Sequence, residues 1–263
     1  MKLSIITVNL NNKAGLQKTI DSVISQTFKD FEWIVIDGGS TDGSKELIEK
    51  YSEYISYWVS EPDKGIYNAM NKGVRVAQGE YLQFLNSGDS LYSHDTLSLI
   101  FNSNPTKDII LGNIISDGKI LKGIGSRKSI SLLDFYYSSV LHPGSYCKRV
   151  LFERYGYFDE TLLICSDWKF FIVTIILHNA SVRYIDKTLV NFDSLGISSK
   201  RENVQRIRTE KTKVLNELIP ERILSNYAFL QNESIVCRYR FSRYCYALLL
   251  KVASIFNREN DIL

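Results

Sequence analysis

The sequence lacks the features that identify several common classes of protein. Its four cysteines form no Cys-x-x-Cys pair, so neither a zinc site nor a disulfide framework is indicated, and we expect a reducing compartment. No apolar run reaches the length of a membrane span. The N-terminus runs directly into a β-rich segment without a visible signal peptide, so we expect a cytoplasmic protein.

The motifs of three large enzyme classes are also absent. No Gly-x-Ser-x-Gly, Gly-x-Gly-x-x-Gly or Gly-Lys-Ser sequence occurs. These motifs form the nucleophile elbow of α/β-hydrolases, the dinucleotide-binding turn and the phosphate-binding P-loop. The sequence therefore disfavours all three classes.

The main part of the chain has almost no excess charge of either sign. The formal net charge is +3. Residues 201–263 hold 11 Lys and Arg residues against 7 Asp and Glu residues, a net of +4, so the first 200 residues sum to −1. Because a nucleic-acid-binding face needs a basic surplus, we expect no nucleic acid as a partner of the main domain.

What the chain does contain is an ordinary globular composition with a regular pattern. It has 263 residues, of which 44% are hydrophobic and 23% charged, enough for one large domain with an appendage. Over the first 90 residues, apolar runs of strand type alternate with segments of helical spacing, which predicts βαβ crossovers and a parallel sheet. The expected strands are 2–8, 31–36, 57–59 and a buried strand opening at Tyr81, and the expected helices include 66–77, ended by Gly79 as a C-terminal glycine.

Polar side chains follow or flank each of these strands. Asn9, Asp37, Asp63 and Asp89 occupy these positions. Because the carboxyl ends of parallel strands point to one edge of a sheet, we expect the four to converge on one crevice, where ligands of open α/β sheets bind. Each of them is also compatible with a turn or a helix cap, but the set indicates a ligand site.

Asp89 stands at the tip of the buried strand, at the end of the run Asn86-Ser87-Gly88-Asp89. Hard cations such as Mg²⁺ are held by one or two carboxylates together with substrate phosphates. Asp89 is therefore the candidate anchor of a metal–diphosphate pair. The alternative is a polar turn after a strand.

The pattern beyond residue 90 is less regular. We expect a strand pair over 109–115 and 120–124 joined by a turn at Asp117-Gly118. The segment 132–137 is ambiguous. The other expected elements are helices over 95–101, near 150–155 and over 168–177, a strand over 182–185 and a loop over 191–199.

Several motifs, in this order, resemble the family 2 glycosyltransferases. The resemblance covers roughly residues 2–200. It implies a GT-A (Rossmann-like) α/β fold over residues 1–200, with a mostly parallel central sheet flanked by helices. The pattern of residues 201–263 itself predicts a helical C-terminal extension. The resemblance also implies an inverting enzyme that uses nucleotide-diphosphate sugars. The motifs are Thr7-Val8-Asn9, 35–44, 64–73, Gly79-Glu80-Tyr81, 85–89, 156–160, Ser166-Asp167-Trp168 and Gly196-Ile197-Ser198.

The resemblance assigns roles position by position. Asp89 resembles the metal-binding acid of the family's Asp-x-Asp region, which implies Mn²⁺ or Mg²⁺ as cofactor. Asp167 resembles the catalytic base. Thr7 and Asp37 resemble contacts to the nucleotide base. The full set that resembles donor-binding residues is Thr7, Asn9, Asp37, Asp63, Lys64, Asn71, Asn86 and Ser87.

Two departures from the family pattern keep two hypotheses open. The run Asn86-Ser87-Gly88-Asp89 retains one acid, and the residue before Asp167 is Ser166 rather than an acid. The first hypothesis is a glycosyltransferase that moves a sugar, from a UDP-sugar by preference, to a hydroxyl of a glycan or lipid-linked acceptor in bacterial surface polysaccharide biosynthesis. The second is a nucleotide-sugar-binding or scaffold protein on the same fold, whose catalysis was lost with the missing acids.

Asp167 discriminates between these hypotheses, because a binding module needs no base. By itself, Asp167 precedes an apolar helix and suits a helix N-cap; the resemblance favours a general base. His142, which precedes Pro143 and Gly144, is a candidate acceptor contact, with a structural histidine as the alternative.

The tail of the chain carries a separate expectation. Residues 204–218 have helical spacing, which ends before Pro220. Residues 237–258 hold five basic residues and no acid, interleaved with aromatic and aliphatic ones. This composition suits a helix in the interface of an anionic membrane, such as the inner face of the cell membrane. The alternative is packing on the catalytic domain or on a second subunit in a homodimer.

Overall fold

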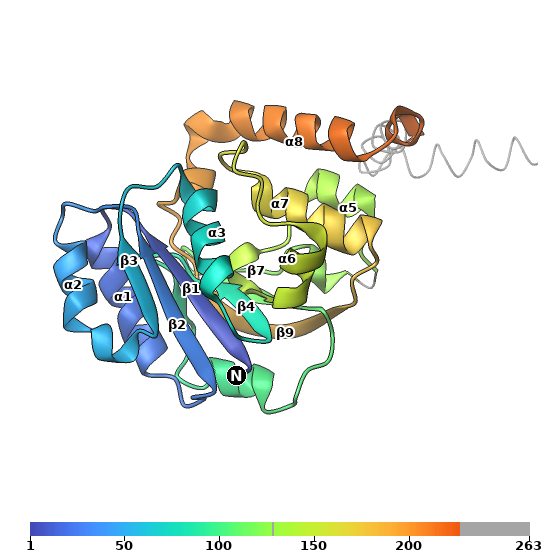
Figure 1. Ribbon diagram of the computed structural model, residues 1–263. Coiled ribbons are helices and arrows are strands. Elements are labelled where there is room, and N and C mark those ends of the chain that lie inside the picture. The colour runs from blue at the N-terminus through green and yellow to red at the C-terminus, as the bar shows by residue number, and fades with distance from the viewer. Residues whose placement is uncertain (128, 227–263) are drawn as a thin grey trace, which may run out of the picture. The chain divides into compact units, whose positions relative to one another are not determined.

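The computed structural model describes residues 1–127 and 129–226. The chain divides into two compact units, Met1–Lys211 and Thr212–Leu263. The first unit contains a central sheet with helices packed against it (Figure 1). Within the second unit the description covers the end of helix α8 (Val204–Leu218) and a helical turn over 221–226. The helix predicted before Pro220 is thereby confirmed.

The first half of the sheet consists of parallel strands in the order β3-β2-β1-β4. The helices between them are βαβ crossovers, as the alternation in the sequence predicted. The strands are β1 (Leu3–Asn9), β2 (Phe31–Asp37), β3 (Tyr57–Ser60) and β4 (Tyr81–Phe84), and the intervening helices are α1 (Lys13–Ile24), α2 (Ser44–Lys50) and α3 (Ile66–Val76).

The second half of the sheet is mixed. Next to β4 lies the antiparallel β8 (Ser145–Lys148), followed by β6 (Ile109–Ser116), β9 (Val182–Asn191) and β5 (Ser90–Leu91). The hairpin of β6 with β7 (Lys119–Leu121) confirms the predicted turn, in which Asp117 and Gly118 both have positive φ. The strands β5 and β8 were not predicted, and β9 runs six residues past the expected end at residue 185.

The remaining described helices are short. The ambiguous segment 132–137 is helical, and the Asp134 carboxylate accepts a hydrogen bond from the Ser131 N–H at 2.8 Å, which stabilises the helix start. The expected helix over 168–177 is an α-helix that continues as a π-helical segment. These elements are α4 (Thr96–Phe101), α5 (Leu132–Tyr137), α6 (Arg149–Tyr155), α7 (Ser166–Phe171), the π-helical η4 (Ile172–Leu177) and the 3₁₀ turns Ser52–Tyr54, Ile124–Ser126, His142–Gly144, Ile197–Ser199 and Arg201–Asn203.

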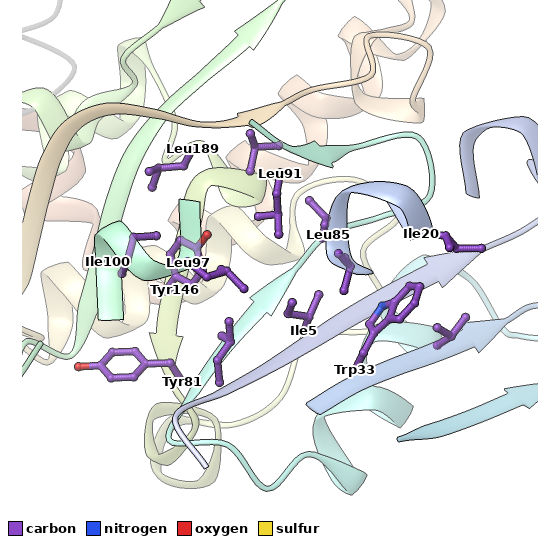
Figure 2. Packing of buried hydrophobic residues seen from close by; sticks show 14 of the residues in the cluster. Ile5, Ile20, Trp33, Tyr81, Leu85, Leu91, Leu97, Ile100, Tyr146 and Leu189 are labelled. Carbon is purple, nitrogen blue, oxygen red and sulfur yellow. The ribbon is translucent and has the colours of Figure 1, made fainter. Parts of the chain in front are cut away.

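One face of the sheet is covered by α1, α2 and α4. Alternate residues of the strands, such as Ile5 and Trp33, point to this face and pack with Ile20 of α1 (Figure 2). The same cluster continues to Leu97 of α4 and Leu189 of β9. This cluster is continuous, so it joins the parallel and the mixed halves of the sheet. Fully burying each large side chain contributes about 1.5–3 kcal/mol to the stability of the fold.

The opposite face carries an aromatic cluster. Phe84 at the end of β4 packs with Phe152 of α6 and with Phe158, at centroid distances of 5.8 and 5.0 Å. Phe152 stacks on Phe170 of α7 at 4.2 Å. Since Phe84 directly precedes the polar run at the end of β4, this cluster fixes α7 near the edge of the sheet where the crevice was expected.

Gly79 differs from its expected role. Helix α3 ends at Val76, the capping residue Ala77 is extended, and Gly79 has no positive φ. A Cβ at Gly79 would lie 2.5 Å from the Leu3 carbonyl carbon and the Ser4 nitrogen. Glycine is therefore required here because the chain passes directly against β1 before it enters β4, and not because it ends the helix.

The membrane and dimer hypotheses rest on residues 237–258, which lie outside the described residues. Among residues 1–127 and 129–226, no helix is long and apolar enough to cross a membrane.

We expect Gly79→Ala to lower the free energy of unfolding by about 1–3 kcal/mol, the usual cost of overpacking. The backbone of β1 would have to move to admit the methyl group. Gly196→Ala is the matched control, because its Cβ would meet only the Asp193 carbonyl oxygen at 3.8 Å and its φ is −64°. Chemical denaturation of both variants measures the difference, and equal stabilities would contradict the close-approach explanation.

Candidate active site

Asp37 forms the centre of a hydrogen-bonded cluster at the ends of β1 and β2. Asn9 lies beside it in the register of the two strands and donates to it at 2.7 Å. The hydroxyls of Ser40 and Ser60 donate to the two carboxylate oxygens, each at 2.6 Å, and the Ser40 N–H at 2.9 Å. Burial raises the pKa of Asp37, but these hydrogen bonds outweigh it and hold the pKa below its usual value. Asp37 is therefore a preorganised anion.

Asp63 lies next to this cluster. A Cβ at Gly38 would lie 3.1 Å from the Asp63 Oδ2 and 3.5 Å from the Asn9 carbonyl oxygen, so these groups surround Gly38. The other oxygen of Asp63 pairs with Lys72 at 2.5 Å. Lys64 is exposed, and its backbone N–H donates to Asn68. The convergence expected for Asn9, Asp37 and Asp63 is thus present in the fold.

Two residues with an expected donor contact have their side chains turned into the protein. Thr7 is fully buried, and its hydroxyl accepts a hydrogen bond from the Trp33 indole at 3.0 Å. Asn71 is also buried, and its amide exchanges two hydrogen bonds with the backbone of Phe158 and donates a third to Glu160. The alternation of β1 and the packed face of α3 direct these side chains inward, so both side chains have structural roles.

Asp89 is buried behind the polar run at the end of β4. Its side chain accepts a hydrogen bond from the Asp193 N–H at 2.9 Å. Burial raises the pKa of Asp89 to about 7, and the negative charge of Asp193 adds to this effect. The Asp193 carboxylate packs against Gly88, where a Cβ would lie 2.5 Å from its Oδ2. The Asp193 carboxylate therefore lies next to the residue that precedes Asp89, close enough for its charge to act on Asp89.

This pair of carboxylates fits a divalent cation. Within the described residues no group of three or more His, Cys, Asp or Glu side chains is placed to hold a metal. One or two carboxylates with substrate phosphates are, however, the usual Mg²⁺ site. Asp89 and Asp193 supply this oxygen-only set. Asp193 was missed because it lies in a segment expected to be a loop, and an acid in a loop carries no local pattern.

Asn86 and Ser87 begin the polar run at the end of β4, and Asn86 reaches a cleft. The Ser87 N–H donates to the Val8 carbonyl oxygen at 3.0 Å, which ties this run to the end of β1. The Asn86 Oδ1 is buried without a hydrogen-bond partner among the described residues. Asn86 also lines the cleft, which has a volume of about 330 Å³ and contains His142 and Asp167 on its wall.

Asp167 is not a helix cap. The N-cap of α7 is Cys165, and Asp167 lies in the first turn of the helix. Its Oδ1 accepts a hydrogen bond from the Tyr67 hydroxyl at 2.9 Å, and its Oδ2 lies 3.6 Å from the His142 Nδ1. The carboxylate is thus held by Tyr67 of α3 and lines the cleft, which is the geometry expected of a base.

Tyr67 is a further residue of the site that the sequence analysis missed. It belongs to the motif 64–73, but nothing local shows that it contacts Asp167. Its hydroxyl also lies 2.5 Å from the Ile164 carbonyl oxygen. Burial raises the pKa of Tyr67 well above its usual value, and the charge of Asp167 adds to this. Tyr67 therefore stays protonated and remains a donor to the carboxylate.

His142 lies beside Asp167 among aromatic rings. Its ring packs near Phe84, Phe158 and Phe171, with centroid distances of 5.0, 5.7 and 6.2 Å. Burial lowers the pKa of His142, although Asp167 opposes this, so the imidazole is neutral at neutral pH. The structure places it on the cleft wall, and its contact with an acceptor stays a prediction.

Comparison with known proteins identifies the family. The family model for glycosyl transferase family 2 matches residues 4–167. The chain belongs to this family. It is 29% identical over 199 residues to a PGL/p-HBAD biosynthesis glycosyltransferase of Mycobacterium bovis, with 73% of this chain and 77% of the relative covered. It is 31% identical over 207 residues to an uncharacterised glycosyltransferase of Mycobacterium tuberculosis, with 76% and 78% covered.

Solved structures confirm the GT-A fold of this family 2 member. Staphylococcus aureus TarS 1-349 in complex with UDP-GlcNAc matches with a TM-score of 0.67 at 21% identity, covering 93% of this chain and 74% of TarS 1-349. The mannosyltransferase of Pyrobaculum calidifontis in complex with GDP-Man and Mn²⁺ matches with a TM-score of 0.61 at 15% identity, covering 97% and 80%. In the match to the UDP complex of TarS 1-349, the chain spans 60% of that protein.

We expect Asp89→Asn to stabilise the metal-free protein more at pH 8 than at pH 5. The folded pKa of Asp89, about 7, lies above the unfolded value of 3.8, so folding is penalised increasingly as the pH rises from about 4 to 7, and fully above that. Asparagine keeps the acceptor for the Asp193 N–H and removes the charge. Thermal unfolding in EDTA should show a Tm gain of a few degrees at pH 8.

The control for this prediction is Asp30→Asn, at an exposed acid preceding β2. Its effect on Tm should not grow between pH 5 and pH 8. A Tm gain for Asp89→Asn that is independent of pH would refute the buried-charge interpretation.

Proposed function

We propose that the protein is an inverting glycosyltransferase that moves a sugar from a UDP-sugar to a hydroxyl of a glycan or lipid-linked acceptor in bacterial surface polysaccharide biosynthesis. The observation that carries this proposal is the position of Asp167. The carboxylate lines the cleft that also contains Asn86 at the end of β4, and it is held there by Tyr67 rather than used as a helix cap.

The donor's nucleotide would bind at the ends of β1 and β2. Asp37 is an anion that is fully buried, with two hydrogen bonds to each carboxylate oxygen, so it would act on the nucleotide by holding Asn9, Ser40 and Ser60 in place. Asn9 and Asp63 flank it around Gly38. The solved complexes of TarS with UDP and UDP-GlcNAc support a UDP-sugar donor. Lys64 is exposed near this end and would add positive charge toward the diphosphate.

Asp89 and Asp193 would hold Mn²⁺ or Mg²⁺ together with the donor. When bound, the cation neutralises the charge of the departing diphosphate as a Lewis acid. The complex of the Pyrobaculum mannosyltransferase with GDP-Man and Mn²⁺ supports a divalent cofactor. Asp193 supplies a second carboxylate where the run Asn86-Ser87-Gly88-Asp89 has one. The missing acids, which motivated the scaffold hypothesis, are thereby compensated from another part of the chain.

Asp167 would act on the acceptor. Its Oδ1 accepts the hydrogen bond from the Tyr67 hydroxyl, so its Oδ2 is the oxygen available to take a proton. The acceptor oxygen attacks the anomeric carbon on the face opposite the diphosphate, while Oδ2 removes the hydroxyl proton. The bond from the anomeric carbon to the phosphate oxygen breaks, the UDP leaves, and the configuration is inverted. A positioned base of this kind contributes about 10²–10⁴-fold.

We expect Asp167→Asn to lose at least two orders of magnitude of activity while retaining donor affinity. Hydrolysis of a panel of UDP-sugars without acceptor, with and without Mn²⁺, measures the loss, because water then replaces the acceptor hydroxyl. The nearly isosteric change preserves the hydrogen bond from Tyr67. The control is Asp30→Asn, a substitution of an exposed acid, which should leave the activity unchanged. Wild-type protein that hydrolyses none of the panel, or unchanged turnover in Asp167→Asn, would count against the proposal.

We expect Asp89→Ala to abolish the Mn²⁺-dependent part of UDP binding. In this variant Asp193 would be the one remaining carboxylate of the proposed pair, which would be too few to hold the cation against the diphosphate. Calorimetric titration of UDP with and without Mn²⁺ gives both affinities. An Asp89→Ala variant with wild-type affinity for UDP and Mn²⁺ would exclude Asp89 as a metal ligand.

A further inference from the structure

The cleft beside Asp167 has a mostly apolar wall with a single cation among its described lining residues. Aliphatic and aromatic side chains, including Met70, Val140 and Ile164, form most of the lining. The cation is Lys211, which lines the same cleft as Asp167 and His142. The two metal-binding candidates do not line it. Lys211 therefore belongs to the side of the site where an acceptor would bind, and not to the diphosphate end of the donor.

Lys211 forms no ion pair with a carboxylate in the part of the chain that the structure describes. Its ammonium lies 4.8 Å from the centroid of the Trp168 ring, a cation–π distance. Among residues 1–127 and 129–226, no carboxylate lies within ion-pair distance of it. Lys211 is partly buried, which lowers its pKa, although the neighbouring Cys165 and the Asp167 carboxylate oppose this effect. Burying an unpaired ammonium is costly unless a partner compensates it.

The position of Lys211 is fixed by its neighbour in α8. The Glu210 carboxylate accepts the backbone N–H groups of Leu163, Ile164 and Cys165 at 2.9, 3.0 and 3.0 Å. These three residues directly precede the helix that carries Asp167. These three hydrogen bonds tie the first half of α8 to the segment that precedes Asp167. They fix the backbone beside Lys211 and thereby hold this lysine at the cleft.

We propose that Lys211 binds a phosphate ester on the acceptor, close to the hydroxyl that Asp167 deprotonates. This inference rests on the proposed function. A phosphate would pair with the ammonium and would offset its burial. A phosphate in this cleft would also need the Lys211 ammonium, because the negative charge of Asp167 repels an anion. The phosphate could belong to a soluble sugar or polyol phosphate, or to the headgroup of an amphiphile.

The rim of the cleft gives a reason to test the amphiphile as well as the soluble ester. Leu121, Leu163 and Ile197 line the cleft and are 41%, 44% and 44% exposed. An alkyl chain leaving the cleft would cover these side chains. A soluble phosphate ester would leave these three side chains exposed to water. The two kinds of phosphate ester therefore differ in whether an attached alkyl chain increases the affinity.

The test measures binding to full-length protein saturated with UDP and Mg²⁺. Two matched pairs of probes are titrated by calorimetry: octyl phosphate with octyl glucoside, and glycerol 3-phosphate with glycerol. We expect the charged member of at least one pair to bind about tenfold more tightly than its neutral counterpart. Preference within the octyl pair alone assigns an amphiphile, and preference within both pairs assigns the phosphate itself. Equal affinities within both pairs would overturn the proposal.

Variants identify the residue responsible. Lys211→Gln and Lys211→Met should both lose the preference for the charged probe, while the control Lys45→Met, at an exposed lysine of α2, should keep it. Two substitutions guard against a fold defect, and their Tm values report it. A preference that survives in both folded Lys211 variants would refute the assignment. Failure of the wild type to bind UDP or to hydrolyse UDP-sugars would instead count against the proposed function.

Discussion

The parallel pairing of β1 with β2 on one side and with β4 on the other is the constraint on which the site depends. This pairing aligns Asn9 with Asp37 and brings the end of β4 to the same edge. The large apolar side chains between the strands and α1 hold the register, because a shift by one residue would exchange the two buried faces of each strand and remove these side chains from the core that they form with α1. A polar crevice at one edge is therefore a consequence of how the core packs.

The carboxylates along this edge are tuned by different surroundings. Asp37 receives four hydrogen bonds and is held as an anion, whereas Asp89 receives fewer and lies buried beside another acid, which raises its pKa. Asp167 lies at the cleft with one oxygen engaged by Tyr67 and the other available. Under the proposed function, three residues of one type would serve three tasks: organising the nucleotide end of the site, retaining a cation and removing a proton.

Helix α3 connects the two halves of the site. Gly73 packs it directly against Ile6 of β1, and Asn71 fixes the backbone at Phe158. From the same helix, Tyr67 reaches the Asp167 carboxylate. Contacts near β1 are thereby joined to the segment that carries Asp167. Under the proposed function, the same helix would link the donor end of the sheet to the acceptor side of the cleft.

The sequence by itself determined the βαβ half of the sheet, the polar ends of its strands and the candidate base, because hydrophobic periodicity and turn residues are local properties. Only the tertiary structure decided that Thr7 and Asn71 face inward, and that Asp193 and Tyr67 join the site. These contacts connect residues 104 and 100 positions apart. Strands as short as β5 and β8 hold too few residues to show a periodic pattern. Their formation depends on pairing with strands that are distant in the sequence, so no local signal predicts them.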